Sequence, residues 1–134
     1  MKRVILIILL TVISATAKAE IVEIDNEELN SLIEMKIPII DIRRKEEWQQ
    51  TGIVAGSYLM TFFDKEGKAD VTRWLQELEV VASKKDPFIL ICRTGRRTGI
   101  VAKFLSEKLG YKKVYDVTDG ITEWIKKGNP TVKP

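Results

Sequence analysis

The 134-residue sequence has no histidine and a single cysteine, Cys92. One cysteine cannot form a disulfide within the chain, and a zinc site would need several cysteine or histidine ligands. The lack of histidine also excludes catalysis by a Ser-His or Cys-His pair. We therefore predict no metal site and no bound cofactor, and any nucleophile in this chain must be activated without an imidazole.

The first nineteen residues have the organisation of a secretory signal peptide. Lys2 and Arg3 form a basic start, residues 4–13 are an almost unbroken apolar run, and the segment ends in Ala17-Lys18-Ala19. This order predicts cleavage after Ala19 and a periplasmic or secreted protein whose single domain covers residues 20–134. The apolar run is shorter than the about 20 residues that span a bilayer, and an uncleaved membrane anchor is the alternative.

The charge of the chain depends on this leader. The full sequence has 22 basic and 19 acidic residues, and three of the basic residues but no acidic one lie in the first nineteen positions. Residues 20–134 therefore hold 19 residues of each sign, so their net charge is zero. They contain no stripe of basic and aromatic residues of the kind that binds nucleic acid. We predict no nucleic-acid partner, and no membrane contact after cleavage of the leader.

Short apolar runs alternate with amphipathic stretches throughout residues 20–134. Predicted strands cover residues 21–24, 38–42, 57–60, 88–91 and 114–117; predicted helices follow Asp25 and Asp70, and cover residues 45–50, about 97–110 and 121–127. This alternation predicts an α/β domain with a mostly parallel central sheet. Active sites in such sheets lie beyond the carboxyl ends of the strands, which is where Cys92 falls.

The segment Cys92-Arg93-Thr94-Gly95-Arg96-Arg97-Thr98 joins a predicted strand to a predicted helix. Successive N–H groups in such a turn can bind an anion, and the helix adds the positive end of its dipole. Gly95 allows the chain to turn tightly. A cysteine at the end of an apolar strand is usually an inert core residue, but three adjacent arginines would be costly to bury. Because cationic surroundings favour the thiolate, we predict that Cys92 is reactive.

The same segment resembles the active-site loop of single-domain rhodaneses, which reads C-x-x-G-x-R-S/T. Three further segments match the family in the same order. The first is Ile39–Arg43, with Glu47-Trp48 after it. The second, Gly52–Ser57, resembles G-H-I-P/A-G-A/S, and the third, Asp119–Trp124, resembles G-G-I/V-x-x-W. Two positions depart from the pattern. Ile53 replaces the usual histidine, and Asp119 replaces the first closing glycine.

The resemblance implies a rhodanese-like domain, with helices on both faces of the sheet, that transfers sulfur. The Cys92 thiolate would attack the outer sulfur of a small anionic donor such as thiosulfate, sulfite would leave, and a persulfide on Cys92 would pass its sulfur to cyanide or to a thiol, including a protein thiol. The residues expected to bind the donor and the persulfide are Arg93, Thr94, Gly95, Arg96, Arg97 and Thr98. Arg93 and Arg96 would attract the donor.

The remaining matched residues have expected supporting roles. Arg97 is expected to turn back toward a carboxylate, either Asp41 or Glu47, and both acids are candidates for supporting the loop. For Asp41 an equal alternative is that it only caps the end of a strand. Trp48 and Trp124 are predicted core residues, as their size and burial preference favour.

Three other functions remain open. Related phosphatases and arsenate reductases use a similar loop, but with five residues between the cysteine and the arginine, whereas four lie between Cys92 and Arg97. Some rhodanese-like domains are binding modules, often without the cysteine. The domain could also carry a persulfide, or sense thiols, for a protein partner without turnover.

Overall fold

The computed structural model describes residues 11–14 and 18–134. The predicted leader lies largely outside these residues, so its function and its cleavage site stay predictions. In the part of the chain that is described, no helix has both the length and the apolar character needed to cross a membrane.

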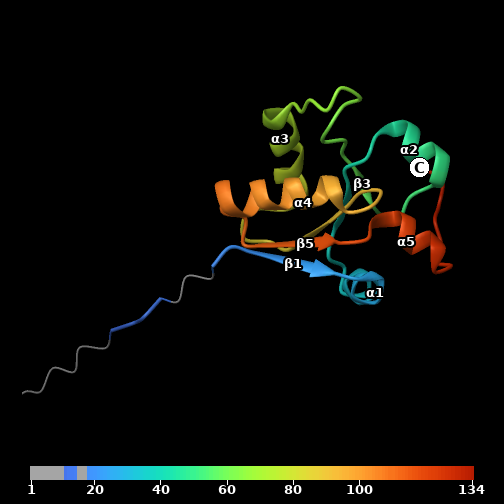
Figure 1. The fold of residues 1–134 in the computed structure, drawn as a ribbon. Coiled ribbons are helices and arrows are strands. Elements are labelled where there is room, and N and C mark those ends of the chain that lie inside the picture. Colours follow the sequence, from blue (N-terminus) through green and yellow to red (C-terminus); the bar gives the residue numbers. More distant parts are fainter. Residues whose placement is uncertain (1–10, 15–17) are drawn as a thin grey trace, which may run out of the picture.

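Five parallel strands form one sheet in the middle of the domain (Figure 1). The strands are β1 (Glu20–Ile24), β2 (Ile39–Asp41), β3 (Tyr58–Leu59), β4 (Phe88–Ile91) and β5 (Lys113–Val117). Their order across the sheet is β1-β5-β4-β2-β3, and every pair is parallel. The predicted parallel α/β sheet is confirmed, and β4, which leads to Cys92, is its central strand.

Helices cover both faces of the sheet, as predicted. The helices are α1 (Asn26–Glu34), α2 (Lys45–Thr51), α3 (Val71–Val81), α4 (Arg96–Lys103) and α5 (Gly120–Lys126). Trp74 of α3 and Val101 of α4 pack into one hydrophobic cluster, and Leu29 of α1 and Trp124 of α5 pack into a second. In Figure 1, α3 and α4 lie above the sheet and α1 lies below it.

The alternating side chains of β4 divide between these two clusters. Phe88, Leu90 and Cys92 belong to the cluster of α3 and α4, whereas Ile89 and Ile91 belong to the cluster of α1 and α5. All five side chains are fully buried. A strand that is covered on both faces has a continuous apolar sequence. Cys92 extends the alternating burial of β4 by one residue beyond the hydrogen-bonded strand.

Local signals in the sequence account for the helix boundaries. The carboxylate of Asp25 accepts a hydrogen bond of 2.8 Å from the backbone N–H of Glu28, and Asp70 accepts one of 3.1 Å from Arg73. Each acid thereby satisfies an N–H group that the first turn of a helix leaves free. The predicted helix of residues 97–110 is α4 followed by a π-helical segment, η1 (Phe104–Lys108), a change of winding that the sequence pattern did not predict.

Candidate active site

The predicted loop lies at the carboxyl edge of the sheet, in the middle of its width. Cys92 follows β4, which pairs with β2 on one side and with β5 on the other. The segments that follow these two neighbouring strands therefore flank the cysteine, and residues 92–95 connect β4 directly to α4. The fold thus places Cys92 where open parallel sheets hold their ligands.

Two groups of the loop contact the sulfur of Cys92. The backbone N–H of Gly95 donates a hydrogen bond of 3.2 Å to Sγ, and the hydroxyl oxygen of Thr98 lies 3.5 Å from it. Thr98 is fully buried, and its hydroxyl also donates to the carbonyl of Gly95 over 3.1 Å. A hydrogen-bond donor at the sulfur stabilises a thiolate more than a thiol, as a nucleophilic role requires.

The first turn of α4 offers further donors. In the described chain, the backbone N–H groups of Arg96, Arg97 and Thr98 form no hydrogen bond within the protein. Such N–H groups at the start of a helix, together with the dipole of the helix, favour an anion. The loop can therefore accept the negative charge of a thiolate, a persulfide or an oxyanion.

Two glycines let the backbone of the loop pack against the β5–α5 connection. Gly95 has φ +94°, and a Cβ added there would lie 1.8 Å from the carbonyl oxygen of Thr118. Gly120 has φ +63°, and a Cβ added there would lie 2.3 Å from the carbonyl oxygen of Arg93. This close approach lets two backbone N–H groups of α5 donate hydrogen bonds to the loop. The N–H of Ile121 donates to the carbonyl of Cys92 over 2.9 Å, and the N–H of Thr122 donates to the carbonyl of Arg93 over 3.1 Å. The closing motif of the sequence therefore supports the cysteine loop directly.

Arg97 pairs with Glu47 of α2. Its two terminal nitrogens donate hydrogen bonds of 2.9 and 2.6 Å to the two carboxylate oxygens of Glu47. The paired side chains are only 19% and 14% exposed. Of the two carboxylates considered from the sequence, the structure places Glu47 against Arg97.

The ion pair perturbs the titration of both partners. Partial burial would raise the pKa of Glu47, but the hydrogen bonds from Arg97 and from the backbone N–H of Arg44 outweigh it and lower this pKa to about 2. The pKa of Arg97 is raised, chiefly by the same hydrogen bond from Arg97 to Glu47. Both groups are therefore charged over the whole range in which the protein is expected to work.

Asp41 makes a separate, fully buried ion pair with Arg43. Its carboxylate accepts hydrogen bonds of 3.0 and 2.8 Å from Nε and Nη2 of Arg43, and both side chains are fully inaccessible to solvent. Arg43 in turn donates to the hydroxyl of Thr51 and to the carbonyl of Gly52 at the end of α2. Among the described residues the Asp41 carboxylate makes no hydrogen bond to the cysteine loop, and its backbone pairs with Ile91, the residue before Cys92, so Asp41 can support the loop through the sheet as well as through α2.

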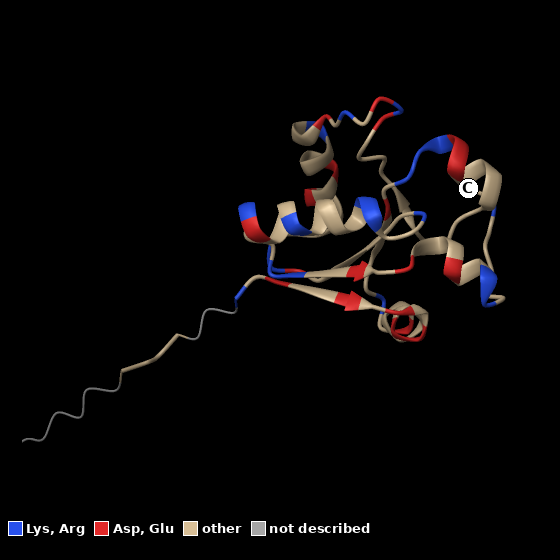
Figure 2. Cartoon of the chain, in the orientation of Figure 1, with Lys and Arg blue, Asp and Glu red and all other residues tan. Residues whose placement is uncertain are grey.

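A cleft of about 470 Å³ opens between the loop and α2. It is lined by Arg43, Arg44, Glu46, Glu47, Gln50, Thr51, Arg93, Thr94, Arg96 and Arg97. In Figure 2 the basic residues at the starts of α2 and α4 lie near each other. The cleft is therefore predominantly positive.

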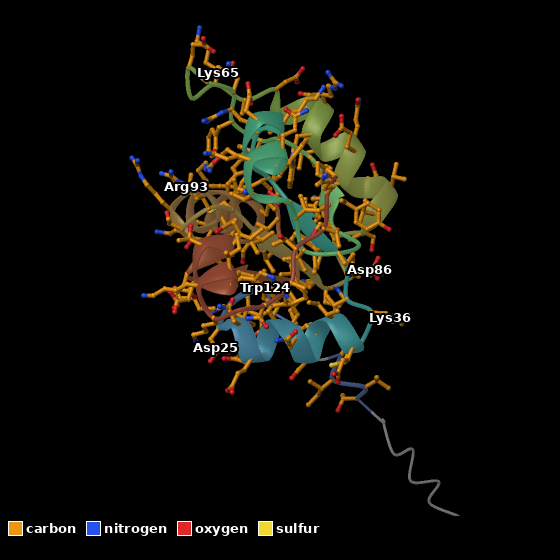
Figure 3. All side chains as sticks on the ribbon, turned by 90° about the vertical axis from the view of Figure 1, so that its right-hand side faces the viewer. Asp25, Lys36, Lys65, Asp86, Arg93 and Trp124 are labelled. Carbon is orange, nitrogen blue, oxygen red and sulfur yellow. The ribbon has the colours of Figure 1, made fainter. Side chains whose placement is uncertain are left out.

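Arg93 and Arg96 are the exposed cations of this cleft. Among the described residues neither side chain forms an ion pair, and Arg93 reaches the surface of the molecule (Figure 3). Thr94, between them, is also exposed, whereas Cys92 is fully buried beneath the loop. A donor would therefore meet the two arginines before its sulfur reaches Cys92.

A second hollow, of about 760 Å³, lies between α2, the segment that follows β3, and α3. It is larger than the cleft, but no residue of the cysteine loop lines it. The smaller cleft is the better candidate site, because four residues of the cysteine loop and the first turn of α4 line it, although Cys92 itself is buried beneath them.

Neither of the two departures from the family pattern is among the groups that contact the sulfur. Ile53 is buried and exchanges two backbone hydrogen bonds of 2.9 Å with Val132, so it joins the C-terminal segment to the domain. Asp119 is exposed and directly precedes α5, while the second glycine of the motif, Gly120, makes the close contact with the loop. Trp48 and Trp124 are buried, which confirms that they belong to the core.

One residue near the site was not found from the sequence. Asp116 in β5 is only 6% exposed, and its Oδ2 would lie 3.8 Å from a Cβ added to Gly99 of α4, the residue after Thr98, whose hydroxyl touches Sγ of Cys92. The sequence signal that could have indicated Asp116 is an acidic residue inside an otherwise buried strand, because buried acidic residues without a partner are rare.

Comparisons with known proteins agree with the fold. An uncharacterized protein of Rickettsia conorii is 32% identical over 90 residues, which cover 61% of this chain and 67% of the relative. The solved polysulfide-sulfur transferase homodimer of Wolinella succinogenes has a TM-score of 0.64 at 22% identity, over 87% of this chain and 81% of the other. A protein of unknown function from Rhodopseudomonas palustris, described as a possible tyrosine phosphatase, has a TM-score of 0.60 at 20% identity, over 84% and 85%.

At these identities the two solved structures establish the fold alone. The family is shown by a sequence model for the rhodanese-like domain, which matches residues 25–127 and so spans most of the chain, including the cysteine loop and the closing motif. The parallel five-stranded sheet and the loop after its central strand agree with that match. The chain therefore belongs to the family of rhodanese-like domains.

Proposed function

We propose that the protein is a sulfurtransferase that moves a sulfane sulfur from a small anionic donor, such as thiosulfate, to a thiophilic acceptor. The observation that carries this proposal is the surroundings of Cys92. Its sulfur accepts the N–H of Gly95, and the loop that holds it also carries the free N–H groups at the start of α4 and two exposed arginines without an ion pair in the described chain. These features suit a thiolate nucleophile that receives a negatively charged substrate.

The proposed reaction has two displacement steps. Arg93 and Arg96 bind the anionic end of the donor, and the Cys92 thiolate attacks the outer sulfur. The bond between the two donor sulfurs breaks, sulfite leaves with the electron pair, and Cys92 becomes a persulfide whose charge the loop N–H groups stabilise. An acceptor, cyanide in the assay or a thiol in the cell, then attacks the outer sulfur of the persulfide and restores the thiolate.

Phosphatase activity is the main competing function, and the name of the Rhodopseudomonas palustris structure gives it a specific basis. Against it stands the length of the loop, in which four residues separate Cys92 from Arg97. Arg97 is also held by Glu47 through both terminal nitrogens, so these nitrogens are not free for an oxyanion. The short loop and the occupied arginine favour a single sulfur atom over a tetrahedral phosphate.

Steady-state assays separate these functions. We expect formation of thiocyanate from thiosulfate and cyanide, with the parallel double-reciprocal lines of a ping-pong mechanism, and complete loss of this activity in Cys92→Ser. Hydrolysis of a phosphoester that is lost in Cys92→Ser, without any thiocyanate, would replace the proposal by a phosphatase. Transfer of a single sulfur without turnover would indicate a persulfide carrier for a protein partner.

We also propose that residues 1–19 export the domain to the periplasm or out of the cell. Strand β1 begins at Glu20, whose backbone N–H donates to the Lys112 carbonyl and whose side chain pairs with Lys113. Cleavage after Ala19 would therefore leave the sheet whole. The mass of the protein from a periplasmic extract should correspond to a chain that begins at Glu20; a full-length chain confined to the cytoplasm would contradict export.

A further inference from the structure

An apolar groove of about 280 Å³ lies between α4 and the segment that connects β3 to α3. Every residue that lines it is apolar or glycine. Ile100 of α4 is 54% exposed there, and Phe63 and Phe104 are partly buried beside it. In Figure 1 the connecting segment lies on the same side of the sheet as α4. A single exposed apolar side chain needs no explanation, but a contiguous apolar hollow on the surface marks a binding site.

The groove adjoins the cleft of the cysteine loop. Both are bounded by α4, where Arg96 lines the cleft and Ile100 lines the groove. These two residues are four positions apart, which is about 6 Å along a helix. The opposite walls are joined as well, because the hydroxyl of Thr61, the neighbour of Phe62 in the groove, donates a hydrogen bond of 2.7 Å to the carbonyl of Arg43 in the cleft. A ligand in the cleft can therefore extend into the groove.

The face of α4 beside the groove is positively charged. Arg96 precedes Ile100 by four residues and Lys103 follows it by three, so these exposed side chains share one face of the helix. Helix α4 contains no acidic residue, and neither cation forms an ion pair in the described chain. The connecting segment, residues 60–70, has three acids and two lysines. Two of these acids, Asp64 and Asp70, accept backbone N–H groups. This surface therefore suits a ligand that is both acidic and apolar.

We propose that the cleft and the groove together bind the sulfur acceptor, and that this acceptor is a polypeptide segment with a cysteine, acidic residues beside it and an apolar side chain a few residues away. The inference rests on the proposed function and names its acceptor. The acidic side chains contact Arg93 and Arg96, and the apolar side chain enters the groove beside Ile100. An extended chain advances about 3.3 Å per residue, so two or three residues cover the separation along α4.

The transfer step passes one sulfur atom between two cysteines. The thiolate of the acceptor attacks the outer sulfur of the Cys92 persulfide, the bond between that sulfur and Sγ breaks, and the electron pair stays on Cys92 as a thiolate. The acceptor leaves as a persulfide, and no oxidant or reductant is consumed. Because Cys92 is buried beneath the loop, an acceptor cysteine that is held at a second point beside it is better positioned for attack. A second copy of the chain does not fit this role, since its one cysteine is buried.

The test uses short synthetic peptides as acceptors for the sulfur-loaded protein. The reference peptide has one cysteine between two acidic residues and a leucine three positions after it. A second peptide has serine in place of the leucine, and a third has lysines in place of the acids. Loss of the persulfide from Cys92 is followed by mass spectrometry in single turnovers. Each rate is divided by that peptide's rate with a small-molecule disulfide, which corrects for differences in thiol reactivity.

Two variants locate the effect on the surface. Ile100→Ser removes the exposed apolar side chain of the groove. Val80→Ser is the matched control, because Val80 is 89% exposed on α3 and does not line the groove. Melting temperatures measured alongside confirm that both variants are folded, and the comparison of peptides on the wild type needs no variant.

We expect the leucine peptide to react about tenfold faster than the serine peptide with the wild type and with Val80→Ser, as one well-packed apolar contact at an interface provides. In Ile100→Ser this ratio should fall to about two or less. The lysine peptide should react slowest at low salt, and its disadvantage should shrink as salt screens the exposed charges. A leucine-to-serine ratio near one in the wild type would overturn the inference. So would an equal ratio in Ile100→Ser and Val80→Ser, or a lysine peptide that reacts faster than the acidic one.

A binding measurement separates this inference from the proposed function. A fluorescent leucine peptide with serine in place of its cysteine cannot accept sulfur, so its anisotropy reports binding alone. Binding that weakens in Ile100→Ser, in a protein that never forms a persulfide, would contradict the proposed function and leave the docking surface intact. Transfer of sulfur to cyanide without any preference among the peptides would do the reverse. In sedimentation, a dimer that Ile100→Ser dissociates would show that a second copy covers the groove, and would overturn the inference.

Discussion

The carboxylate of Glu47 in α2 receives two hydrogen bonds from the guanidinium of Arg97 in α4, a residue 50 positions further along the chain. One oxygen of Glu47 also accepts the backbone N–H of Arg44 at the start of α2. This arrangement joins the first turn of α4, which follows the cysteine loop, to the helix on the opposite side of the cleft. Arg97 therefore helps to fix the shape of the site, whereas Arg93 and Arg96 are the arginines proposed to bind the donor.

Replacing Arg97 by alanine should lower both stability and activity. The variant leaves Glu47 half-buried without its partner, which should cost about 1–3 kcal/mol and lower the melting temperature by roughly 5–10 °C for a domain of this size. Arg93→Ala is the matched control, because Arg93 is exposed and unpaired. It should weaken donor binding with little change in melting temperature. Loss of activity in Arg97→Ala at unchanged stability would refute the structural role.

The same ion pair should make stability depend on acid pH. The pKa of Glu47 is about 2 in the folded protein and 4.5 without these contacts. The contribution of the ionised carboxylate to the free energy of unfolding is therefore complete above pH 4.5 and is lost as the pH falls toward 2. We expect Glu47→Gln to be less stable than the wild type by about 2 kcal/mol at pH 7, and this difference should shrink below pH 4. Urea unfolding at pH 7, 4 and 3 measures it. A difference that is constant with pH would mean that the charge of Glu47 is not responsible.

Gly120→Ala should disrupt the loop far more than its backbone strain alone predicts. An added Cβ would lie 2.3 Å from the carbonyl oxygen of Arg93 and would push α5 away from the loop. Gly110→Ala is the control, since Gly110 has a similar positive φ of +74° and no atom within 4 Å of the added Cβ. The control should cost about 1 kcal/mol of unfolding free energy, and Gly120→Ala several times more. Equal costs would show that the close packing of α5 on the loop is unimportant.

The buried pair of Asp41 and Arg43 should matter more for stability than any exposed pair. Asp41→Asn leaves a fully buried guanidinium without its counter-charge, and breaking such a pair costs about 3–5 kcal/mol. Glu46→Gln breaks the exposed pair with Lys65 and should cost less than about 1 kcal/mol. Denaturant unfolding compares the two variants. A mild effect of Asp41→Asn, with loss of activity, would instead assign Asp41 to the chemistry.

Much of this fold could be predicted because its local signals and its hydrophobic pattern agree. The run Phe88–Ile91 is apolar at every position and is buried on both faces, and Asp25 and Asp70 cap the helices that follow them. The winding of Phe104–Lys108 into a π-helix has no comparable signal in the sequence. It depends on how the end of α4 meets the rest of the domain, and no local propensity encodes that.

The site could be predicted in part for a similar reason. The cysteine loop is continuous in the sequence, so its residues were found together. The choice between Asp41 and Glu47 as partner of Arg97 depends on which side chains the fold brings together, and only the structure places Glu47 there. Asp116 was missed because it lies near the cysteine loop only through the packing of β5 against the start of α4 at Gly99, which no spacing in the sequence reveals.

The proposed sulfur transfer requires a persulfide on Cys92, which intact-mass spectrometry of the thiosulfate-treated protein would detect. We expect a gain of one sulfur atom, located on Cys92 by fragmentation, removed by cyanide, and absent in Cys92→Ser. No adduct at any donor concentration, in protein whose Cys92 thiol is still free for alkylation, would contradict it.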